Sequence, residues 1–169
     1  MTLFGIDAST TSTGLSVFID GKLKEYARIK GNSKDVYERI KNISIGIEKY
    51  FRLYTPEYVF IEDVPLSNAV NRRVAEKLIL LQGCILHLSQ SYDSCFVQIP
   101  PLKWRKLSGV VCENKREKQK QSAIELVNQV YGTSFEWTTK EDDEKNGNSD
   151  ICEAILIGKA GISIIEGDY

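Results

Sequence analysis

The chain has 169 residues, 42% of them hydrophobic and 27% charged, which is the composition of a globular protein large enough to bury a core. Its net charge of −1, taken alone, does not indicate a polyanionic partner, and its four scattered cysteines and lone His87 exclude a disulfide framework, a zinc site and a histidine-based hydrolase. No apolar stretch reaches the roughly 18 residues of a membrane span, and the N-terminus has no signal-peptide pattern. We therefore expect one domain over residues 1–169, in the cytoplasm and without a membrane partner.

The net charge conceals two segments of opposite sign. The first, which we call the basic segment, lies between Pro101 and Lys120 and contains Lys103, Arg105, Lys106, Lys115, Arg116, Lys118 and Lys120. The second lies between Glu136 and Glu153 and is rich in Asp and Glu. A basic and an acidic segment in one small domain are typical of a nucleic-acid surface beside a metal-binding cleft. The same two segments fit equally well with two ordinary solvent-exposed faces.

The N-terminal part of the chain predicts a small antiparallel sheet. Apolar and alternating patterns predict strands at residues 2–7, 13–19 and 22–30, with Asp20-Gly21 as a hairpin turn. Ser33 is the expected N-cap of a helix that continues to Tyr54, because apolar residues recur there at helical spacing. A short buried strand at 58–61 then stops at Glu62.

The second half alternates helices and strands. A helix at 68–91 is apolar on more than one face, so it is either a deep core helix or a contact with a second copy of the chain. The remaining elements follow in order: a strand at 95–99, a short turn around Trp104, a helix at 115–131, a loop at 133–149 and a last helix from Ser149 or Asp150 to about Ile165. The order predicts an α/β fold, with a mixed five-stranded sheet and helices on both faces.

Four acidic residues lie next to apolar, buried segments, where a carboxylate is costly unless a cation or a hydrogen bond stabilises it. Asp7 and Glu62 follow the apolar runs of two predicted strands, and Asp150 and Glu153 lie three residues apart on one face of the last helix. Because ligands collect at the carboxyl ends of strands in such sheets, we expect these acids to meet. A site with only carboxylate ligands suits Mg²⁺ or Mn²⁺, and four carboxylates can hold two ions for attack on a phosphodiester.

Each acid also has a purely structural explanation that needs no metal. In this alternative, Asp7 only ends a strand and Glu62 pairs with a lysine. Asp150 would then be the N-cap of the last helix, and Glu153 would complete a capping box with it. If the strand register slips by one residue, Asp63 replaces Glu62 as the ligand.

Three motifs, GIDASTTSTG, FIEDV and SDICEAILIG, resemble in sequence and order the acidic motifs of the RuvC-type Holliday junction resolvases, in the RNase H-like superfamily. The resemblance implies a metal-dependent endonuclease that nicks four-way or branched DNA and works as a homodimer without a small-molecule cofactor. It identifies Asp7, Glu62, Asp150 and Glu153 as the catalytic, metal-binding acids, and it places Lys106 and Lys118 near the DNA.

The chain departs from this family at two places. Glu153 stands where the family often has aspartate, and the stretch Asp63 to Leu66 lacks the aromatic residue of cellular members. With the short length, these departures indicate a phage or viral branch acting in a bacterial or phage-infected cytosol. Two other hypotheses remain. In the first, the chain is an ATP-binding phosphotransferase lobe, because GIDASTTSTG also resembles the phosphate loop of sugar kinases and actin-like ATPases. In the second, it is a non-catalytic module that binds branched DNA.

Overall fold

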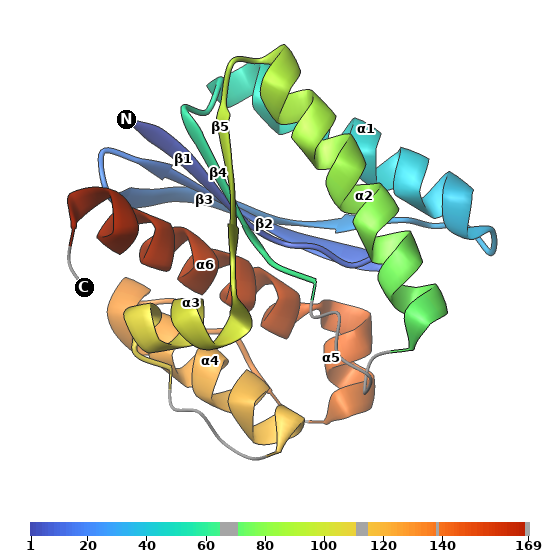
Figure 1. The fold of residues 1–169 in the computed structure, drawn as a ribbon. Helices are drawn as coiled ribbons and strands as arrows, with labels where there is room; N and C mark the ends of the chain where they lie inside the picture. Colours follow the sequence, from blue (N-terminus) through green and yellow to red (C-terminus); the bar gives the residue numbers. More distant parts are fainter. Residues whose placement is uncertain (65–70, 111–114, 138, 168–169) are drawn as a thin grey trace.

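A computed structural model describes residues 1–64, 71–110, 115–137 and 139–167 of the chain (Figure 1). Five strands form one mixed sheet in the order β3-β2-β1-β4-β5. Their bounds are β1 Thr2–Asp7, β2 Ser12–Ile19, β3 Lys22–Lys30, β4 Tyr58–Glu62 and β5 Cys95–Ile99. The first three strands pair antiparallel, whereas β4 lies parallel to both β1 and β5. The predicted mixed α/β sheet is therefore confirmed.

Helices cover both faces of this sheet (Figure 1). They are α1 Val36–Tyr54, α2 Arg72–Ser91, α3 Pro101–Ser108, α4 Arg116–Tyr131, α5 Lys140–Asn146 and α6 Asn148–Glu166. One hydrophobic cluster lies between the sheet and the pair α1 and α2, and a second lies between the sheet, α6, α3 and α4. None of the described helices is long and apolar enough to cross a membrane.

Four details of the predicted helices need correction. The N-cap of α1 is Asp35 rather than Ser33, because the Asp35 carboxylate accepts hydrogen bonds from two backbone N–H groups of the first turn. The expected turn around Trp104 is the helix α3, which starts with Pro101 at its first position. The expected loop at 133–149 contains α5, which Thr139 caps, and α6 already begins at Asn148.

The predicted helix at 68–91 begins at Arg72 in the structure, with Asn71 as its N-cap, while positions 68–70 lie outside the described residues. The 115–131 helix begins one residue later than expected, because Lys115 is its N-cap. These shifts of a few residues leave the order of the elements unchanged.

Two glycines allow α6 to lie directly on the sheet. A Cβ atom at Gly5 of β1 would come within 2.4 Å of the backbone nitrogen of Gly158, and one at Gly14 of β2 would come within 1.9 Å of the Asp150 carbonyl oxygen. Neither position can hold a side chain without displacing the helix. The close approach brings the first turns of α6 to the end of β1, where Asp7 lies.

Candidate active site

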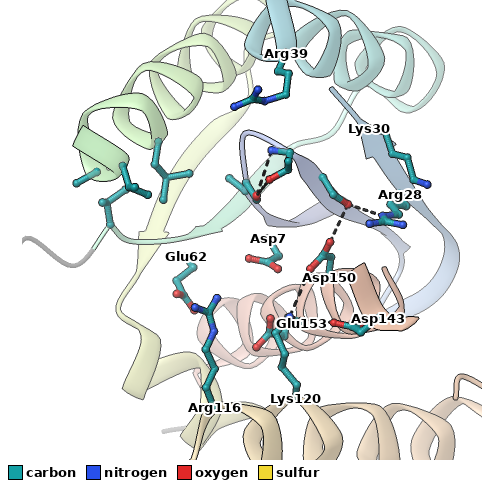
Figure 2. A pocket seen from close by; sticks show the side chains of 18 of the residues that line it. Asp7, Arg28, Lys30, Arg39, Glu62, Arg116, Lys120, Asp143, Asp150 and Glu153 are labelled. Atoms are coloured by element: carbon teal, nitrogen blue, oxygen red, sulfur yellow. Dashed lines mark hydrogen bonds and ion pairs between the residues drawn. The ribbon is translucent and has the colours of Figure 1, made fainter. Parts of the chain in front are cut away.

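The four predicted acids line a single pocket of about 1100 Å³ at one edge of the sheet (Figure 2). Asp7 ends β1 and Glu62 ends the parallel neighbour β4, where Ile6 pairs with Ile61, so both carboxylates emerge at the same edge. Asp150 and Glu153 enter from α6. Within the described residues, no three His, Cys, Asp or Glu side chains converge closely enough to form a ready-made metal cage.

The four carboxylates influence one another electrostatically. Burial raises the pKa of Asp7 well above its usual range, and the negative charges of Glu153, Asp150 and Glu62 raise it further. Burial likewise raises the pKa of Glu153 to about 7, although the nearby Lys120 opposes the shift. Because it is costly to ionise all four acids together, the pocket is a site where a bound cation would stabilise the charged carboxylates.

Glu62 is held by two neighbouring side chains of α3. The buried indole N–H of Trp104 donates a hydrogen bond to the Glu62 carboxylate, and an Arg105 guanidinium nitrogen lies 3.6 Å from the same oxygen. The Arg105 guanidinium also lies over the Trp104 ring, 4.7 Å from its centroid. Burial raises the pKa of Glu62, while the Trp104 hydrogen bond and the Arg105 charge lower it. The partner of Glu62 is therefore an arginine, not the lysine of the alternative hypothesis.

Asp150 does not cap its helix. The N-cap of α6 is Gly147, which has no side chain, and the Asp150 carboxylate instead accepts a 2.8 Å hydrogen bond from the Ser12 hydroxyl on β2. Arg28 of β3 donates in turn to the Ser12 oxygen at 2.5 Å. Burial raises the pKa of Asp150, whereas the Ser12 hydrogen bond and the charge of Lys120 oppose the shift. The capping-box alternative for Asp150 and Glu153 is thus wrong.

Lys120 of the basic segment points into the acidic pocket. Its ammonium nitrogen lies 3.1 Å from a carboxylate oxygen of Asp143, 2.7 Å from the Ser149 hydroxyl and 4.0 Å from Asp150. Asp143 also accepts a 2.8 Å hydrogen bond from the Ser149 backbone N–H, so it joins α5, α4 and the start of α6. Sequence reasoning missed Asp143 because it placed this residue in a loop. The Thr139-x-x-Asp142 spacing, typical of a helix N-cap, was the available signal.

The rest of the basic segment lies around and outside the pocket. Arg105 and Arg116 line the pocket, as does Lys120. The exposed members are Lys103, Lys106, Lys115, Arg116 and Lys118. On the opposite side, Arg28, Lys30 and Arg39 also line the pocket. They were not predicted, because they are spread over a strand and a helix rather than gathered in one basic run.

No family model matches the chain, and no curated protein matches it. Its fold matches that of Thermus thermophilus RuvC bound to a Holliday junction substrate, with a TM-score of 0.74, 17% identity, and coverage of 99% of this chain and 97% of that one. A second Thermus thermophilus RuvC structure gives 0.72, with the same identity and coverage. The yeast mitochondrial Holliday junction resolvase gives a TM-score of 0.56 at 12% identity, covering 94% of this chain and 77% of that one. The chain therefore has the fold of the RuvC Holliday junction resolvases, as its ordered acidic motifs predict.

Proposed function

We propose that the chain is a metal-dependent, structure-selective endonuclease that nicks Holliday junctions or other branched DNA. The observation that carries this proposal is the meeting of Asp7, Glu62, Asp150 and Glu153 in one pocket, in a chain with the RuvC fold. The cationic side chains around the pocket provide a complementary surface for a DNA backbone. We further propose that residues 1–169 act as a single nuclease domain, from a phage or viral branch of the resolvases.

The donor set of the pocket fits hard divalent cations. Its four candidate ligands offer only carboxylate oxygens. Burial raises the pKa of all four, and the charges of the other acids add to the shift for Asp7 and Glu153, which a cation would offset. Asp7, Glu62, Asp150 and Glu153 would hold Mg²⁺ or Mn²⁺, with two ions per site. When bound, such ions supply an activated water and stabilise the departing 3′ oxygen of a phosphodiester, which leaves a 5′ phosphate on the product.

The surrounding side chains orient this acidic set. Trp104 and Arg105 fix the carboxylate of Glu62, and Ser12 fixes that of Asp150. Lys120 balances part of the negative charge beside Asp143 and Asp150. Side chains held in this way are already placed before DNA arrives, which lowers the cost of forming the reactive arrangement.

A homodimer provides the second active site that symmetric nicking of a junction requires. Leu81 and Ile85 of α2 are fully buried against the sheet, whereas Ile79 and Leu86 on the same helix are 46% and 38% exposed. We propose this exposed apolar face of α2 as the contact between two copies of the chain.

The test is cleavage of three synthetic DNAs of equal length, a four-way junction, a fork and a plain duplex, with and without Mg²⁺. We expect Mg²⁺-dependent nicking of the branched DNAs, with little cutting of the duplex. ATP-dependent phosphate transfer would instead support the kinase-like hypothesis. Tight junction binding without cleavage under any divalent ion would support the non-catalytic hypothesis.

A further inference from the structure

The pocket has a second cationic side, formed by β3 and α1. Lys30 lies at the end of β3 and Arg39 in the first turns of α1, while Arg116 and Lys120 of α4 line the pocket from the other side of the acids (Figure 2). Asp7 lies between the two cationic sides in this view. The acids are thus flanked by positive charge from two separate parts of the fold.

Lys30 and Arg39 differ from three cations of α1 and α2 that lie away from the pocket and pair with an acid one turn along the helix. Lys41 pairs in this way with Glu38 at 3.0 Å. The same holds for Arg52 with Glu48 and for Arg72 with Glu76. In the part of the chain that the structure describes, neither Lys30 nor Arg39 forms an ion pair with a carboxylate, so both keep an uncompensated charge in the pocket.

Main-chain carbonyls of three residues hold the Arg39 guanidinium in place. Its Nε donates to the Thr10 oxygen at 2.9 Å, and its Nη1 donates to the Ser33 and Lys34 oxygens at 3.2 and 3.0 Å. Gly31 leaves room for this side chain, since a Cβ there would come within 2.6 Å of the Arg39 Cβ. Among the described residues the Nη2 group has no acceptor, which leaves two N–H donors for an anion.

Lys30 extends this surface at the open edge of the sheet. Its ammonium nitrogen makes one long contact within the described residues, 3.3 Å to the Lys145 carbonyl oxygen, and its side chain is exposed. An ammonium group with three donors can keep this contact and still bind a phosphate oxygen. Lys30 and Arg39 together therefore offer one flexible and one fixed cation on the same side of the acids.

We propose that Lys30 and Arg39 bind a backbone phosphate of the DNA on the β3–α1 side of the acids, opposite the basic segment of α3 and α4. The inference rests on the proposed function and adds to it a second phosphate-binding surface. The backbone is then held on both sides of the cleavage site. Because lysine and arginine here meet phosphates and not base edges, the contact contributes affinity without sequence preference.

The test compares Lys30→Glu with Lys24→Glu. Lys24 is exposed on the same strand and does not line the pocket, and it lies roughly 20 Å along β3 from Lys30. Binding of a labelled four-way junction is measured by fluorescence anisotropy in EDTA, so that no cleavage intervenes, over a series of salt concentrations. We expect Lys30→Glu to weaken binding on the order of tenfold at low salt and to reduce the salt slope by about 1.

Lys24→Glu is expected to change neither quantity, because it makes the same charge change away from the pocket. A variant with Arg39→Gln should weaken binding similarly, and its thermal melting curve reports whether the loop it holds is still folded. Equal binding by Lys30→Glu and Lys24→Glu would overturn the inference. If the wild-type chain itself fails to bind the junction, the proposed function fails instead, so the two failures are distinguishable.

Discussion

At the scale of single residues, Trp104 is the side chain on which the position of Glu62 depends most directly. Trp104 is only 1% exposed, and its indole N–H donates to the Glu62 carboxylate from the first turn of α3. Replacing Trp104 by phenylalanine removes this donor and keeps most of the ring packing. The carboxylate then loses its orientation, and we expect the Mg²⁺ concentration for half-maximal cleavage to rise several-fold, with a loss of about 1 kcal/mol in stability.

Metal binding can also be measured without cleavage, by calorimetric titration of the free protein with Mn²⁺. We expect Trp104→Phe to weaken this Mn²⁺ binding. The matched control is Trp137→Phe, because Trp137 packs against the α6 side of the core and does not line the pocket. Identical metal affinity in Trp104→Phe and the wild type would contradict the role given to this hydrogen bond.

The buried carboxylate of Glu153 predicts a pH-dependent stability of the metal-free protein. Burial raises the pKa of Glu153 to about 7, so between about pH 4.5 and 7 the folded state binds more protons than the unfolded state. Stability therefore falls as pH rises through this window and levels off above it. Glu153→Gln should stabilise the metal-free protein at pH 8 by on the order of 2 kcal/mol, and much less at pH 5.

This prediction is checked by urea denaturation in EDTA at both pH values. The Glu48→Gln variant is a suitable control, since Glu48 lies on α1 away from the pocket and pairs with Arg52 at 2.7 Å. A gain from Glu153→Gln that is the same at pH 5 and pH 8 would show that the buried negative charge of Glu153 is not its cause.

At the scale of elements, the basic segment concentrates exposed cations at the start of α4. Lys115, Arg116 and Lys118 are exposed, and Arg116 also lines the pocket. Replacing these three residues by alanine should weaken junction binding strongly and reduce the salt slope by up to about 3, one for each phosphate that is no longer neutralised. An unchanged salt slope, measured by anisotropy, would place the DNA on another surface.

The elements also show which parts of the fold are predictable from sequence. The strands were predicted almost to the residue, because buried strands are apolar runs and the Asp20-Gly21 turn marks the hairpin. The helices α3 and α5 were missed because they are short and largely polar, so that no apolar periodicity marks them. The predicted N-cap Ser33 is wrong because Asp35, a second capping residue, stands two positions further on, and only the folded backbone decides between them.

The candidate site also has a part that the sequence predicts and a part that it does not. The four acids were recognisable because carboxylates next to apolar runs are unusual in sequence. Their supporting partners were not, because Trp104 is 42 residues from Glu62 in the chain and Ser12 is 138 residues from Asp150. Contacts of this kind depend on the packing of α3 and α6 against the sheet, and no local pattern encodes them.

At the scale of the whole molecule, the proposed function requires two active sites related by a two-fold axis. We expect a species of about twice 19.1 kDa in sedimentation at micromolar concentration. Charged substitutions at Ile79 and Leu86 should dissociate it, because a desolvated lysine opposes an apolar contact. Leu53→Lys on α1, at a residue 70% exposed, is the control that should leave the dimer intact. A 19.1 kDa species that nicks both strands of a junction in concert would remove the basis for this interface.

The central claim is that the pocket acids catalyse hydrolysis of branched DNA with divalent metal. The most direct measurement compares the wild-type chain with Asp7→Asn on a synthetic four-way junction, scoring Mg²⁺-dependent nicking and, in parallel, junction binding. Asp7 lies at the end of β1 among the other three acids, so its loss should abolish nicking. Binding should stay intact or tighten, because one negative charge facing the DNA is removed. Full Mg²⁺-dependent nicking by Asp7→Asn would contradict the account.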